Sequence, residues 1–135
     1  MTFEEVEQSL PNGFHDAALR GISADFVNLS IKLEMELHAS VEGDANPERY
    51  LRGVLSVTRP YLFFLDPPDS RYGFIPRGMP VNASGFALKA GKDPKIDALL
   101  QRIPADATAF VFFLDDWNTY LYVAGATVQF SWDYR

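Results

Sequence analysis

The chain has 135 residues, of which 47% are hydrophobic and 14% aromatic, and it carries a formal net charge of −6 at pH 7. This length is typical of a single domain with a packed core, so we expect one domain over residues 1–135. The lack of cysteine excludes disulfides and thiolate nucleophiles and suits a reducing cytoplasm. The acidic charge disfavours nucleic acid as a partner, and no apolar run approaches the ~20 residues that span a membrane.

The N-terminal segment predicts a short helix over residues 2–10. Thr2 and Glu5 have the spacing of a capping box, and acidic residues follow in the first turn. Residues 11–13, Pro-Asn-Gly, end the helix. This acidic start lacks the basic and apolar regions of a secretory signal, so we expect a cytoplasmic protein without membrane contact.

Residues 28–38 alternate between apolar and polar side chains without exception. Side chains on a strand point to opposite faces with period two, so this run predicts a half-buried antiparallel strand. A weaker strand over 17–24 and a turn over 25–28 precede it. The apolar positions of the run are Leu29, Ile31, Leu33, Met35 and Leu37.

The middle of the chain predicts a strand over 49–58 and an apolar strand over 61–65 that is covered on both faces. Pro60 between them marks an edge, a bend or a bulge. Residues 66–91 are rich in proline and glycine and predict a long irregular segment, with a short strand near 86–89.

Asp93 and Pro94 open an amphipathic helix over 94–103, which Pro104 ends. The C-terminal third predicts strands over 109–114, 118–124 and 127–133. Gly125 serves either a two-residue hairpin loop or a bulge in one long strand. The predicted fold is α+β, a mostly antiparallel twisted sheet of about seven strands with two helices, one of which lies across a face of the sheet.

Catalytic residues are few, because His15 and His38 are the only histidines. His38 falls on the wet face of its strand, which is typical of a surface residue. His15 precedes Asp16, and a histidine beside a carboxylate can act as a general base. Neighbours on an extended chain point opposite ways, however, so a structural role for His15 and Asp16 is the alternative.

The carboxylates match no metal-binding pattern, and two histidines without cysteine make a zinc site improbable. Asp115 and Asp116 are typical turn residues. Nucleotide-binding glycine loops and a nucleophile elbow are absent from the sequence. We therefore predict no metal and no cofactor.

The irregular segment carries residue types that are favoured at protein interfaces. It is either a lid over the sheet or a partner contact. The predicted binding residues are Arg71, Tyr72, Phe74, Arg77 and Met79.

The opening Asn12-Gly13-Phe14-His15-Asp16-Ala17 and the end Val128-Gln129-Phe130-Ser131-Trp132 resemble those of small uncharacterised bacterial β-rich proteins. Some of these are similar to immunity proteins of polymorphic toxin systems. The resemblance implies a cytosolic bacterial module that antagonises a toxin.

Three functions follow as hypotheses. The first is a non-enzymatic binding module for a protein partner, of the inhibitor or immunity type. The second is a carrier of a small apolar ligand, which needs an enclosed cavity of roughly 300 Å³. The third is a hydrolase or isomerase that uses His15, and a homodimer is left open. The expected lining of the carrier cavity is Phe63, Phe64, Phe112, Tyr120 and Tyr122.

Overall fold

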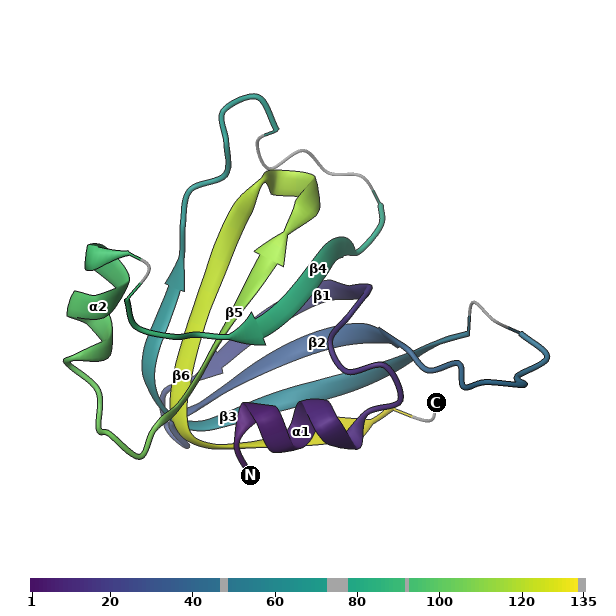
Figure 1. Cartoon of the computed structure of the whole chain (residues 1–135), viewed down its shortest axis with the longest axis horizontal. Helices are drawn as coiled ribbons and strands as arrows, with labels where there is room; N and C mark the ends of the chain where they lie inside the picture. Colours follow the sequence, from purple (N-terminus) through teal and green to yellow (C-terminus); the bar gives the residue numbers. More distant parts are fainter. Residues whose placement is uncertain (47–48, 73–77, 92, 134–135) are drawn as a thin grey trace.

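The computed structural model describes residues 1–46, 49–72, 78–91 and 93–133. Within these residues the chain forms a closed antiparallel barrel of six strands in the order β1-β2-β3-β6-β5-β4, with two short α-helices (Figure 1). The elements are α1 (Phe3–Ser9), β1 (Ala17–Asp25), β2 (Ser30–His38), β3 (Tyr50–Leu65), β4 (Val81–Ala87), α2 (Pro94–Leu100), β5 (Thr108–Leu114), the 3-10 helix η1 (Asp115–Trp117) and β6 (Thr119–Trp132).

The predicted α+β class with an antiparallel sheet is confirmed, but the seven-strand count is wrong. Two pairs of predicted strands are each one long strand, β3 and β6, and β4 begins five residues before the strand expected near 86–89. Gly125 makes no hairpin, because it continues β6 and pairs with Pro60 on one side and Thr108 on the other. A side chain there would collide with Val57, so the position needs glycine for close packing.

Strand β2 confirms the alternation that sets the fold. Ile31, Leu33, Met35 and Leu37 are at most 6% exposed, while the residues between them face outward. Leu29 is the exception. It lies in the turn before the strand with φ of +51° and is 55% exposed.

Strand β3 bends at Pro60, as the missing amide predicts. The bulge adds one residue to β3 rather than to β6, because the pairs run from Pro60–Gly125 directly to Leu62–Ala124. Cover on both faces of 61–65 was wrong, since Tyr61 and Phe63 are 43% and 41% exposed.

The barrel interior is filled by side chains from all six strands and from α1. Four phenylalanine rings pack together in this interior, one pair stacked and the others edge-on or tilted, with neighbouring centroids 5.1–5.5 Å apart. The Thr108 hydroxyl accepts a 2.8 Å hydrogen bond from the Phe3 amide and so ties α1 to β5. The four rings belong to Phe3, Phe14, Phe110 and Phe112.

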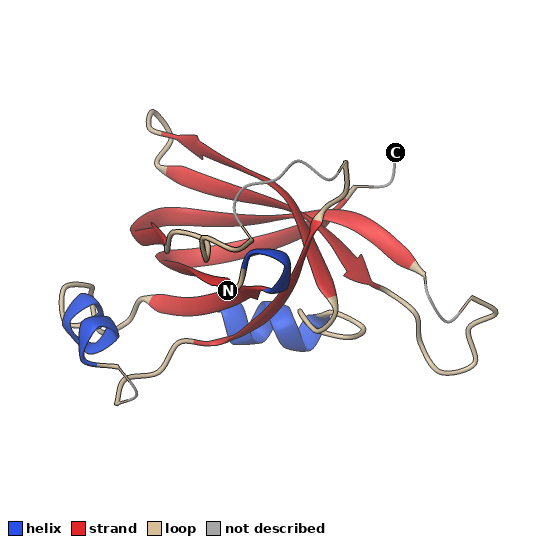
Figure 2. Cartoon of the chain, turned by 90° about the horizontal axis from the view of Figure 1, so that it is seen from above, coloured by secondary structure: helices blue, strands red, loops and turns tan. Residues whose placement is uncertain are grey.

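Helix α2 lies outside the barrel (Figure 2). It buries Ile96 against Val111 and Tyr122, with Leu62 and Phe64 packed around them. The helix ends at Leu100, three residues before the predicted end, because the residue before a proline avoids helical geometry and the last turn loosens ahead of Pro104. One face of the sheet is therefore covered, as expected.

Candidate functional site

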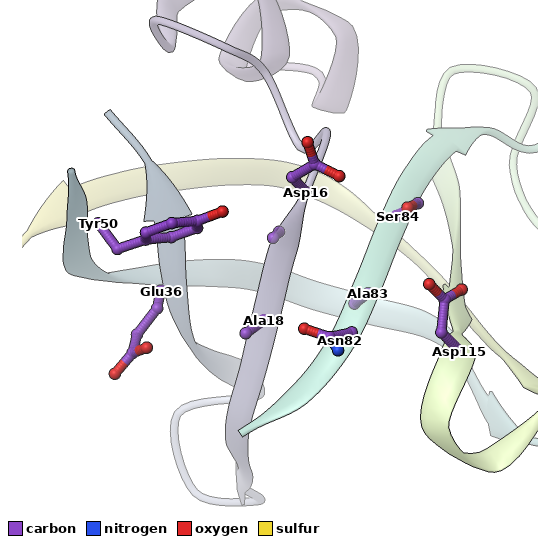
Figure 3. Close-up of a pocket in the computed structure, with 9 residues that line it drawn as sticks. Asp16, Ala18, Glu36, Tyr50, Asn82, Ala83, Ser84 and Asp115 are labelled. Carbon is purple, nitrogen blue, oxygen red and sulfur yellow. The ribbon is translucent and has the colours of Figure 1, made fainter. Parts of the chain in front are cut away.

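An open cleft of about 410 Å³ lies where β1 and β4 close the barrel, and we call it the rim cleft (Figure 3). These strands share only three residue pairs, from Ala17–Ala83 to Leu19–Val81. Small side chains at the junction leave the hollow open. Its lining is Asp16, Ala17, Ala18, Glu36, Tyr50, Asn82, Ala83, Ser84 and Asp115.

Asp16 is placed at the cleft by the turn between α1 and β1. The Asn12 side-chain amide donates 2.8 Å hydrogen bonds to the carbonyls of His38 and Ser40, which fixes this turn over the end of β2. Asp16 itself has a left-handed backbone, with φ of +54°. That conformation turns the chain into β1 with the carboxylate at the mouth of the cleft (Figure 3).

The opposite wall comes from η1. Asn118 ends η1 in a left-handed conformation, with φ of +47°, and its amide donates to the Asp115 carbonyl at 3.2 Å. The neighbouring Asp116 carboxylate accepts a 2.8 Å hydrogen bond from the Asn82 amide, which fixes η1 to β4. Asp115 therefore faces the cleft across β4 from Asp16 (Figure 3).

The three carboxylates of the lining are not equivalent. Glu36 is neutralised by Arg20 at 2.7 Å and by Arg52 at 3.6 Å. Among the described residues, the ion-pair partner of Asp16 is the exposed His15 imidazole, 3.5 Å away. Asp115 has no ion-pair partner among the described residues. The cleft therefore has negative charge on two opposite walls, and no lysine or arginine of the described residues forms an ion pair with either wall.

His15 lies on the surface rather than in a cleft. Its side chain is 80% exposed, and its Nε2 lies 3.5 Å from Oδ2 of Asp16. The left-handed backbone of Asp16 brings the two neighbours together, which the extended-chain argument did not expect. The distance exceeds a hydrogen bond, so a catalytic role for His15 and Asp16 stays a prediction.

The segment between β3 and β4 was predicted to be either a lid over the sheet or a partner contact. Its first part is held down by Asp69, whose carboxylate accepts from the Arg71 guanidinium at 3.0 Å and from the Asn118 amide at 3.4 Å. These hydrogen bonds, the Arg71 ones first, hold the pKa of Asp69 far below its usual range. The segment is thus fixed to η1, beside the rim cleft.

Of the predicted binding residues, Tyr72 and Met79 are 44% and 70% exposed, and the Arg71 side chain is 79% exposed. Phe74 and Arg77 lie outside the described residues. The partner contact of this segment therefore stays a prediction.

A second hollow, of about 280 Å³, lies on the outer face of β4, β5 and β6 beside α2, and we call it the aromatic groove. Phe86 and Tyr120 at its edge are 48% and 41% exposed. Burial raises the pKa of Tyr122 to about 12, and the nearby Asp66 carboxylate adds to the rise. The groove is lined by Phe86, Ala87, Leu88, Lys89, Asp93, Ile96, Val111, Tyr120 and Tyr122.

The residues expected to line a carrier cavity lie on two different faces. Phe112 is inside the barrel, whereas Phe64 and Tyr122 pack outside it against α2. The groove was not predicted from the sequence, because both faces of β5 and β6 are apolar. The signal was nevertheless present, since Tyr120 and Tyr122 alternate with the interior residues Leu121 and Val123.

In the described part of the chain, no group of three or more histidine, cysteine, aspartate or glutamate side chains could hold a metal ion. Neither of the helices described has the length and hydrophobicity to cross a bilayer. No protein-family model, curated protein or solved structure matches the chain. The likeness to immunity proteins therefore stays a prediction.

Proposed function

We propose that the chain is a non-enzymatic protein-binding module whose rim cleft receives a cationic side chain of its partner. The observation that carries this proposal is the placement of Asp16 and Asp115 on opposite walls of one open cleft without a described cation between them. A guanidinium or ammonium group in the cleft would lie between two carboxylates and complete the missing charge pairs.

The rest of the lining suits arginine better than lysine. Tyr50 presents a half-exposed ring, 46% accessible, over which a planar guanidinium can stack. The Asn82 and Ser84 side chains supply further oxygens on the β4 side. An arginine can use its five donors on such a set of acceptors, whereas an ammonium group has three.

The net charge of −6 attracts a basic protein surface over a long range and so speeds its association with the chain. Tyr72 and Met79, both exposed in the segment between β3 and β4, would supply the apolar contact that a charged rim alone lacks. An acidic module on the cationic face of another protein blocks that face, which is how an inhibitor or immunity protein would act. The bacterial cytoplasm as its location belongs to the same proposal.

A fluorescent hexa-arginine peptide tests the cleft through its anisotropy. We expect the double variant Asp16→Asn/Asp115→Asn to bind about 3- to 10-fold more weakly than wild type at low salt, because two exposed charge contacts are lost. The matched control is Glu4→Gln/Asp106→Asn, which removes two exposed carboxylates outside the cleft and so has the same net charge as the cleft variant.

Salt must weaken the binding of the wild type, since exposed charges are screened. Equal affinities for the two double variants would show that the peptide reads net charge alone. That result would contradict the proposal.

A further inference from the structure

The turn between β1 and β2 leaves several large apolar side chains in contact with solvent. We call residues 25–30 the hairpin tip. Phe26 and Val27 are 86% and 90% exposed, and Leu29 is 55% exposed. Single exposed apolar residues are ordinary, but three large ones on one six-residue turn form a patch that is typical of a contact surface.

The hairpin tip is held in one conformation by Asp25. Its carboxylate accepts hydrogen bonds from the amides of Val27 at 2.9 Å and Asn28 at 3.0 Å, and from the Asn28 side chain at 2.8 Å. These hydrogen bonds already order the backbone of the turn in the monomer, so the backbone loses little freedom when the tip binds.

The aromatic groove is large enough to accept apolar side chains of the hairpin tip. An apolar cavity of about 150 Å³ accommodates a benzene ring. The groove, at about 280 Å³, therefore has room for the Phe26 ring and part of the Val27 side chain. Its floor is apolar or aromatic, with Val111, Tyr120 and Tyr122 beneath and Phe86 at the edge.

The charges at the two surfaces are complementary. Lys89 at the groove edge has no ion-pair partner among the described residues, and the negative Asp25 lies next to Phe26. Lys32 lies close enough to Asp25 to lower its pKa, after the larger effect of the Asn28 hydrogen bonds. Asp93, on the other side of the groove, can face that lysine.

We infer that the hairpin tip of one copy occupies the aromatic groove of a second copy, reciprocally, in a twofold dimer. The hairpin tip and helix α2, which borders the aromatic groove, lie toward the same end of the molecule (Figures 1 and 2). A twofold axis near that end can therefore exchange two tips at once. The starts of β1 and β4, whose residues line the rim cleft, lie away from this end (Figure 1). The cleft therefore stays open in the proposed dimer.

The contact is small, because it consists of two tips and two grooves. Stable interfaces bury about 1,200–2,000 Å², and a Phe ring contributes about 150–250 Å². We therefore expect a reversible dimer with a Kd on the order of 10–100 µM.

Sedimentation velocity over a concentration series from about 5 to 500 µM tests the inference, around the Kd expected for a small interface. We expect wild type to move from monomer to dimer in this range. The tip variant Phe26→Ser and the groove variant Phe86→Ser should each shift the midpoint at least about tenfold upward, since each removes an aromatic anchor. Val41→Ser, an exposed residue outside both surfaces, is the control and should dimerise as wild type does.

Mixing the two variants separates this arrangement from other dimers. A heterodimer of Phe26→Ser and Phe86→Ser keeps one intact tip-in-groove contact, so the mixture should associate more strongly than either variant alone. Far-ultraviolet circular dichroism confirms that both variants are folded.

A wild type that stays monomeric throughout the series would overturn the inference, as would a dimer that both variants leave unchanged. Vesicles of phosphatidylcholine and phosphatidylglycerol provide one further outcome. Monomeric wild type that binds them through Phe26 would assign the tip to a lipid surface instead. Loss of the dimer leaves peptide binding at the rim cleft untouched, so the two proposals fail separately.

Discussion

The amide of Arg59 donates a 2.9 Å hydrogen bond to the carbonyl of Leu29, and both residues have a left-handed backbone with φ of +51°. For residues with a Cβ this conformation costs about 1–2 kcal/mol each. The bend of β3 and the start of β2 are thus strained at one point, directly behind the hairpin tip. Such strain gathers at functional sites, which agrees with a contact role for the tip.

Relief of this strain is measurable at Leu29. We expect Leu29→Gly to be more stable than Leu29→Ala by about 0.5–1 kcal/mol, because glycine adopts positive φ freely and alanine does not, less the extra entropy of glycine in the unfolded chain. Both variants lose the same exposed side chain. Urea unfolding at a concentration where the protein is monomeric gives the difference, and an alanine variant at least as stable would contradict the strain.

The phenylalanine core leaves no room above Gly85. A Cβ at this position would lie 2.6 Å from the Phe110 ring and 2.7 Å from the Phe112 ring. Gly85→Ala should therefore destabilise the barrel by about 1–3 kcal/mol through overpacking.

Gly21→Ala is the matched control for Gly85. Its nearest neighbour would be the Glu34 carboxylate at 3.6 Å, an ordinary contact. We expect its free energy of unfolding to stay within about 0.5 kcal/mol of wild type. Equal losses for the two alanine variants in urea titrations would mean that the interior is looser than described.

Ionisation of Tyr122 is expected to lower the stability of the barrel at high pH. Its pKa is about 12 in the folded chain and about 10 when unfolded, so the unfolded state ionises first. The contribution of Tyr122 to the free energy of unfolding is fully present below pH 10 and is lost as the pH rises toward 12. We expect a loss of about 1 kcal/mol, because the hydroxyl end near the open groove is partly solvated.

Tyr122→Phe tests the source of this loss, since phenylalanine cannot ionise. Its stability should fall less than that of wild type between pH 10 and 12 in parallel urea titrations. Identical slopes for the two proteins would assign the loss to other tyrosines or to lysines.

The local pattern of apolar and polar residues predicted the strands well, but it did not predict which segments continue into one long strand. The alternation of Ile31 to Leu37 fixed the buried face of β2, and Thr2 caps α1 through its hydroxyl as the capping box requires. Gly125 was ambiguous, because a glycine that turns the chain and a glycine that admits a neighbouring side chain look the same in one sequence. Only the partner strand, through Val57, decides between them.

The rim cleft could not be found from the sequence. Asp16 and Asp115 are 99 positions apart in the sequence and line the same cleft only because β1 pairs with β4 to close the barrel. This pairing involves three residues and has no sequence pattern that predicts it. The exposed hairpin tip was visible as Phe26 and Val27, but the turn prediction gave no reason to expect both side chains in solvent.

Chemical-shift mapping of the ¹⁵N-labelled protein during titration with hexa-arginine tests the central claim most directly. We predict that the shifts concentrate at Asp16, Ala18, Asn82 and Asp115 around the rim cleft, weaken with added salt, and disappear in Asp16→Asn/Asp115→Asn but not in Glu4→Gln/Asp106→Asn. Shifts of equal size at all exposed carboxylates, including Glu4 and Asp106, would contradict the claim that this cleft is a binding site for a cationic partner.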